Sequence, residues 1–107
     1  MQIRLSAQHS ELPLGLDEAA ADTIGRLERF DPRLQRADVH LSVEHNPRIH
    51  DRILCEVTLH GGGEPVHCQV AGPDVPTTLT RAMHRLEHLL EKRKTQRLHR
   101  RHEAGTR

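Results

Sequence analysis

Three segments of this chain alternate apolar and polar residues with a period of two. They are "ADVHLSVEH" (37–45), "RILCEVTLH" (52–60) and "EPVHCQVAG" (64–72). Successive side chains of a β-strand point to opposite faces, so each segment is predicted to form a strand with one buried and one exposed face. The "GGG" at 61–63 predicts a hairpin between the last two strands. This pattern constrains the chain to build a sheet that is covered on one side only.

The rest of the chain supplies one more strand and two helices. The segment "QIRLSAQ" (2–8) alternates in the same way. Apolar residues recur three or four positions apart over 14–29, which predicts an amphipathic helix with Pro13 near its start. A second apolar stripe over 75–90 predicts another helix, with Asp74 as its cap. Helix-forming residues continue after that stripe, so we expect the second helix to extend beyond the core.

The predicted order of elements is β-α-β-β-β-α. This order favours the α+β class, as a two-layer sandwich in which a four-stranded mixed sheet carries two helices on one face. The first two strands should be parallel and joined by a right-handed crossover. A chain of 107 residues forms one domain. We assign residues 1–97 to the folded binding domain and residues 98–107 to a basic, frayed tail.

The charge of the chain is strongly divided although the net charge is only +1. Residues 81–107 contain nine Lys and Arg against three Glu, whereas residues 1–80 contain seven basic and twelve acidic residues. A concentration of positive charge at one end of the chain indicates either a binding surface for a polyanion or a solvated helix face. Charge alone leaves both interpretations open. The candidate phosphate contacts are Arg26, Arg29, Arg81, Arg85, Lys92, Arg93, Lys94 and Arg97. The first two would join the others if the two helices lie parallel.

The near absence of aromatic residues bears on the kind of polyanion. Phe30 is the only aromatic side chain. Recognition of single-stranded nucleic acid depends on stacking of bases on aromatic rings, so that mode is disfavoured. Structured RNA, recognised by shape and phosphate, fits better. One hypothesis within this class is a general double-stranded RNA-binding module.

The residues indicate no enzyme, and we expect no cofactor and no small-molecule substrate. The "HGGG" at 60–63 matches an oxyanion-hole motif of lipase-type hydrolases, but the chain has no G-x-S-x-G and is too short for that fold, so the motif is interpreted as a turn. No phosphate-binding loop of the G-x-x-x-x-G-K-[ST] type is present.

Histidines and cysteines leave a weaker hypothesis of a metal site. His84 and His88 are spaced to share a helix face, but no third ligand is indicated, so exposed histidines are favoured over a metal site. Cys55 and Cys68 fall on core-facing positions and are interpreted as buried thiols. No segment has the apolar length of a membrane span and the N-terminus lacks a secretion signal, so we expect a cytoplasmic protein without membrane contact.

Several short motifs, in order, resemble one family of proteins. They are "MQI" at the first strand, "GRLERF" in the first helix, "VHLSVE" in the second strand, "GGE" in the hairpin, "AGPD" before the second helix and "RLEHLLEKRK" within it. Together they resemble the ribosome hibernation promoting factors, also called ribosome-associated inhibitors or protein Y, over nearly all of the first 97 residues. Arg85, Lys92 and Lys94 fall on the basic positions of the family.

The resemblance implies a fold and a function. The fold is the β-α-β-β-β-α sandwich already predicted. The function is to bind the small ribosomal subunit in the channel for messenger RNA and transfer RNA, with both helices on ribosomal RNA, and to keep idle ribosomes inactive in stationary phase or stress without catalysis. The resemblance also implies a short form without a C-terminal dimerisation domain. The basic tail favours promotion of ribosome pairing over its prevention.

Overall fold

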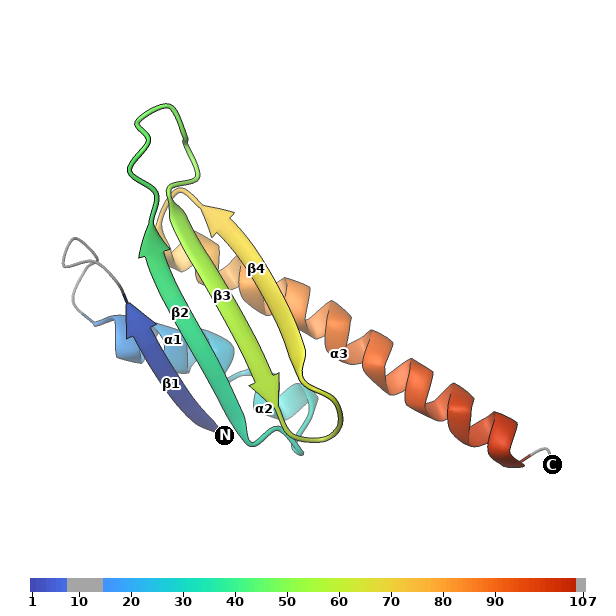
Figure 1. Ribbon diagram of the computed structural model, residues 1–107. Coiled ribbons are helices and arrows are strands. Elements are labelled where there is room, and N and C mark those ends of the chain that lie inside the picture. The colour runs from blue at the N-terminus through green and yellow to red at the C-terminus, as the bar shows by residue number, and fades with distance from the viewer. Residues whose placement is uncertain (8–14, 106–107) are drawn as a thin grey trace.

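The structure is a computed structural model that describes residues 1–7 and 15–105, with side chains described up to residue 96. Four strands and three helical segments follow one another along the chain (Figure 1). The strands are β1 (Gln2–Ala7), β2 (Arg36–Val43), β3 (Ile53–His60) and β4 (Val66–Gly72), and the helices are α1 (Leu16–Ile24), α2 (Leu27–Phe30) and α3 (Val75–Gly105). The predicted class and order are confirmed, with the first predicted helix divided into two segments.

The four strands form one mixed sheet in the order β1-β2-β3-β4. β1 runs parallel to β2, whereas the pairs β2–β3 and β3–β4 are antiparallel. In this register Val39 lies opposite Leu5 on one side and Val57 on the other. All three helices lie behind the same face of the sheet (Figure 1). The parallel first pair and the single covered face are as predicted.

The core lies between the sheet and the helices. Alternate residues of the central strands are buried from Ala37 to Leu41 and from Cys55 to Leu59, because the period of two directs those side chains toward the helical layer. The α3 stripe from Val75 to Leu90 covers them, with Leu79 and Leu86 fully buried. Cys55 and Cys68 are free, buried thiols within this core, as predicted.

The first predicted helix, over 14–29, is interrupted at Gly25 and Arg26. Across the interruption the backbone makes shorter-range hydrogen bonds, from Glu28 N to Gly25 O (3.2 Å) and from Arg29 N to Arg26 O (3.1 Å). Such bonds tighten a turn, and glycine has a low helix propensity. The predicted start of this helix at Pro13 and residue 14 lies outside the described residues.

The start of α3 follows the predicted cap. Asp74 Oδ1 accepts a hydrogen bond from Thr77 N (2.8 Å), and this bond lowers the pKa of Asp74. The hydroxyl of the fully buried Thr78 donates to Asp74 O (2.6 Å).

The last turns of α3 project beyond the end of the sheet (Figure 1). The molecule is therefore elongated, with dimensions of 57 × 28 × 17 Å. This long extension was expected from the sequence. α3 includes residues 98–105, but the side chains of the predicted tail lie outside the described part of the chain.

Candidate nucleic-acid interface

Three of the predicted cations follow the side of α3 that lies along β4. Arg81, Arg85 and Lys92 are spaced four and seven residues apart, which places them on neighbouring positions of one helix face. Arg81 is engaged within the protein, because its Nη1 donates to Asp51 Oδ2 (3.0 Å) and to Ala71 O (2.8 Å). Arg85 and Lys92 are exposed and have no ion-pair partner among the described residues. These two cations are therefore available to a ligand.

Lys94 lies on another side of α3, beside the end of the first helical region. It lines a hollow with Phe30, Pro32 and Leu90. Phe30 is 45% exposed, the largest fraction among the big apolar side chains of the described residues. Lys94 itself is exposed and has no ion-pair partner among those residues. The free cations thus lie on two sides of the helix and do not form one flat patch.

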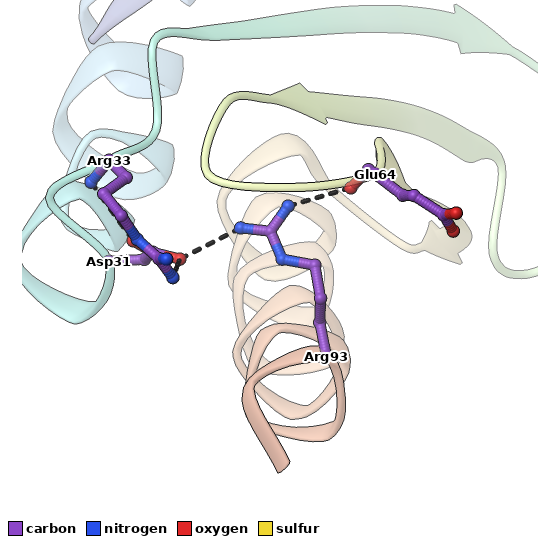
Figure 2. Close-up of polar contacts among 4 residues, drawn as sticks. All are labelled: Asp31, Arg33, Glu64 and Arg93. Carbon is purple, nitrogen blue, oxygen red and sulfur yellow. Dashed lines mark hydrogen bonds and ion pairs between the residues drawn. The ribbon is translucent and has the colours of Figure 1, made fainter. Parts of the chain in front are cut away.

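Arg93 occupies a different environment from its two lysine neighbours. Its side chain is only 14% exposed. Nη2 donates to Asp31 Oδ2 (2.9 Å) and Nη1 donates to the carbonyl oxygen of Glu64 (2.8 Å), as Figure 2 shows. The guanidinium therefore joins α3 to the connection between α2 and β2 and to the turn between β3 and β4. It faces the protein and not the solvent.

Asp31 is the centre of this group of contacts. Arg33 donates to it three times, through its backbone N (3.1 Å) and Nε (3.1 Å) to Oδ1 and through Nη2 (3.2 Å) to Oδ2. Burial of the carboxyl group acts to raise its pKa, but the hydrogen bonds from Arg33 and Arg93 outweigh burial and lower it. Asp31 is therefore ionised and fully paired at neutral pH.

The three glycines of the β3–β4 turn make room for these contacts. All three have positive φ, from 76° at Gly62 to 148° at Gly63. A Cβ on Gly62 would lie 3.0 Å from Arg93 Nη2, and one on Gly61 would lie 2.5 Å from Arg33 O. The "HGGG" motif is a turn, as predicted, and it also allows Arg93 and the α2–β2 connection to approach closely.

The two predicted cations of the first helix lie elsewhere. Arg26 and Arg29 line a hollow with Met1 and Ile3 at the β1 edge. α3 packs mainly against β4, at the opposite edge of the sheet, and also contacts β3, α1 and α2. Both arginines are exposed. The structure does not bring them beside Arg85 and Lys92. The side chain of Arg97, the eighth predicted cation, lies outside the described residues.

The open face of the sheet carries a separate polar network. Ser6 Oγ and His40 Nδ1 are 2.7 Å apart, Thr58 Oγ1 and His67 Nδ1 are 2.9 Å apart, and His60 Nε2 lies 3.1 Å from Asp38 Oδ2. Within the described part of the chain no group of three or more His, Cys, Asp or Glu residues could hold a metal ion. His84 and His88 are exposed on α3. The histidines named here are therefore either paired with another side chain or exposed on α3.

Over the same residues, no helix is both long and apolar enough to cross a membrane.

Comparison with known proteins identifies the family. The model of the family described as sigma 54 modulation protein / S30EA ribosomal protein matches residues 3–98. The chain belongs to this family. The resemblance inferred from the sequence motifs is thereby confirmed. A search of curated proteins found no match.

Solved structures share the fold of this chain. One is a ribosomal subunit interface protein from Coxiella burnetii, with a TM-score of 0.73 and 18% identity over 89% of this chain and 99% of that chain. Another is the N-terminal domain of Thermus thermophilus Protein Y, with a TM-score of 0.71 and 21% identity over 86% of this chain and 98% of that chain.

The sequence did not point to Asp31 and Glu64 as partners of the basic helix. One local signal was available for Asp31, because an Asp before "PR" can accept the backbone N–H two residues later, as it does from Arg33. No local signal identifies Glu64, since it contributes a backbone carbonyl. The helical period did indicate that Arg93 lies on the buried side of α3, because it is three residues after the buried Leu90.

Proposed function

We propose that this protein binds the small ribosomal subunit through its ribosomal RNA, in the channel used by messenger RNA and transfer RNA, and so keeps idle ribosomes inactive. The observation that carries the proposal is membership of the S30EA ribosomal protein family together with the exposed cations of α3. Occupying the channel requires no chemistry, so the proposed action is binding alone, in the cytoplasm where ribosomes are.

Phosphate contact is the physical basis of the proposed binding. Arg85, Lys92 and Lys94 project from one rigid helix, and cations on a rigid element can contact successive phosphates with little loss of conformational entropy. Arg26, Arg29 and Arg97 are proposed as further contacts. Arg81 shares its guanidinium with Asp51, so it is proposed as a weaker contact.

Sedimentation with purified ribosomes through a sucrose gradient tests the proposal. Co-migration with the small subunit that weakens as salt rises is expected, because phosphate contacts release counterions. A heavier peak of paired ribosomes would add pairing to the proposed function. Protein that stays at the top of the gradient at low salt would overturn it, and binding to any RNA duplex without preference for ribosomes would instead favour a general double-stranded RNA-binding module.

A pair of double variants separates specific contact from net charge. Lys92→Glu with Lys94→Glu reverses two exposed cations of α3, and ribosome binding is expected to be lost. Arg4→Glu with Arg48→Glu changes the net charge equally, but alters exposed residues of β1 and of the β2–β3 loop. This control is expected to bind nearly as well as the natural protein. Equal loss in both would show that net charge alone drives association.

A further inference from the structure

Arg93 lies between two exposed lysines, yet it continues the buried face of α3. The buried residues Leu86 and Leu90 precede it by seven and three positions. At this spacing the three side chains share one side of the helix. The next position of the apolar stripe is therefore filled by a guanidinium, which needs polar partners because it is nearly enclosed.

Both ends of the guanidinium have such partners. One nitrogen binds the Asp31 carboxylate and the other binds the Glu64 carbonyl (Figure 2). These two partners belong to segments that are 62 and 29 residues away in the chain. A planar guanidinium directs its N–H groups along fixed directions, so binding both partners at once restricts where α3 can lie.

The partners are themselves held in place. Arg33 binds both oxygens of Asp31. The stem of Arg93 lies against the turn, since a Cβ on Gly63 would lie 3.4 Å from Arg93 Cδ. The contact thus joins the helix to two connections that are packed against each other, because Gln35 N donates to His60 O (2.8 Å).

Little else within the described chain holds α3 after this point. In residues 94–96, the side chain of Thr95 donates a hydrogen bond through Oγ1 to Glu91 O (3.0 Å), which lies in the same helix. We call residues 94–105 the α3 extension. The extension projects past the sheet (Figure 1). Within the described side chains, Arg93 makes the last hydrogen bonds that join α3 to another segment.

We propose that Arg93 is a positioning residue, which fixes the direction of the α3 extension through Asp31 and Glu64 and does not itself bind RNA. The inference rests on the proposed function, because it assigns Lys92 and Lys94 to RNA and Arg93 to holding them in place. It separates three consecutive cations into two roles that their charge alone does not distinguish.

Asp31→Asn is expected to change ribosome binding in opposite directions, depending on whether Arg93 binds RNA or positions the α3 extension. The variant removes a negative charge near the proposed interface, so an Arg93 that bound RNA directly would be freed and ribosome binding would strengthen. If Arg93 positions the extension, Asp31→Asn weakens binding, by about tenfold if loss of order is the cause. Tighter or unchanged binding by Asp31→Asn would overturn the inference.

The salt dependence gives a second test with matched variants of neighbouring residues. Lys94→Gln is expected to reduce the slope of log affinity against log salt by about one, because one phosphate contact is lost. Arg93→Gln is expected to lower affinity with an unchanged slope. Arg93→Lys keeps the charge but not the planar fork, so it should behave like Arg93→Gln. A slope reduced by Arg93→Gln and full rescue by Arg93→Lys would instead make Arg93 an RNA contact.

A distance measurement separates failure of this inference from failure of the proposed function. Spin labels at Thr95→Cys and Gln69→Cys report the direction of α3 relative to the exposed side of β4. A narrow distance distribution that broadens in both Asp31→Asn and Arg93→Gln is expected without any ribosome present. An unchanged distribution would overturn the positioning role, whereas absence of ribosome binding by the natural protein would overturn only the function. Circular dichroism establishes whether each variant is folded. If Arg93→Gln does not fold, the measurement on Asp31→Asn alone tests the inference.

Discussion

Gly61 has no room for a side chain, because a Cβ at this position would lie 2.6 Å from the backbone nitrogen of Gln35. The same atom would lie 2.5 Å from Arg33 O. Both neighbours are backbone atoms, so no rotation of a side chain can relieve the contact. Gln35 N also donates to His60 O, which keeps the two connections together. The start of the β3–β4 turn is thus fitted to the α2–β2 connection.

Gly61→Ala is therefore expected to lower the free energy of unfolding by about 3 kcal/mol, from a left-handed backbone and a contact with backbone atoms. Gly15→Ala is the matched control, because Gly15 also has a positive φ (83°) but a Cβ there would meet no atom of the described residues within 4 Å. Its expected cost is about 1 kcal/mol, from conformation alone. Urea unfolding of the two variants measures the difference. Equal costs would show that the dihedral angle, and not the close approach, limits Gly61.

The ion pairs of Asp31 are expected to make the free energy of unfolding depend on pH. Hydrogen bonds from Arg33 and Arg93 hold its pKa below the ordinary value in the folded protein. A carboxylate with a lowered folded pKa stabilises the fold above its unfolded pKa of about 3.9, and that contribution is lost as pH falls through the folded pKa. Asp31→Asn should therefore cost about 2 kcal/mol at pH 7 and progressively less below about pH 4.

Urea unfolding of the natural protein and Asp31→Asn between pH 7 and pH 3 measures this difference. The comparison removes the contribution of the other carboxylates, which both proteins share. A stability difference that stays constant over this range would mean that the ionised Asp31 does not contribute through its charge.

The strands could be predicted from the sequence because the period of two is a local property. In "DVHLSV" and "CEVTLH" each apolar position faces the helices, and a shift by one residue would expose the whole set. The predicted strand limits differ from the observed ones by at most two residues. The break at Gly25 was harder to predict, because a single glycine weakens a helix without fixing where it is interrupted.

The candidate site was only partly predictable. Charge selected the basic residues of α3 as a group, but it could not tell Arg93 from Lys92 and Lys94. The distinction depends on Asp31, which is 62 residues away and reaches Arg93 only after the sheet and helices have packed. Arg81 is similar, since its partner Asp51 lies 30 residues away in the β2–β3 loop. Contacts of this kind follow from tertiary structure and leave no pattern in the local sequence.

The two cysteines are expected to be unreactive in the folded protein. Burial, with a smaller contribution from Cys68, raises the pKa of Cys55 to about 12. Burial also raises the pKa of Cys68, to about 11, against the opposing effects of the Val57 backbone and Arg85. At pH 8 the thiolate fraction at such pKa values is about 0.1% or less.

Iodoacetamide should therefore modify neither thiol under native conditions at pH 8 and both in denaturant, as measured by mass spectrometry. Fast modification of the folded protein would show that β3 and β4 separate readily. Slow modification should begin at Cys68, which is 5% exposed whereas Cys55 is fully buried.

Arg81 and Arg85 lie one helical turn apart, and their replacement is expected to have different effects on ribosome binding. Arg85 has no ion-pair partner among the described residues, whereas Arg81 binds Asp51 and the Ala71 carbonyl. Arg85→Gln should reduce the slope of log affinity against log salt by about one if the proposed phosphate contact of Arg85 is made. Arg81→Gln removes the same charge but should reduce the slope by clearly less, since Asp51 already neutralises much of it. Sedimentation at several salt concentrations gives both slopes, and equal slopes would mean that Asp51 releases Arg81 when RNA binds.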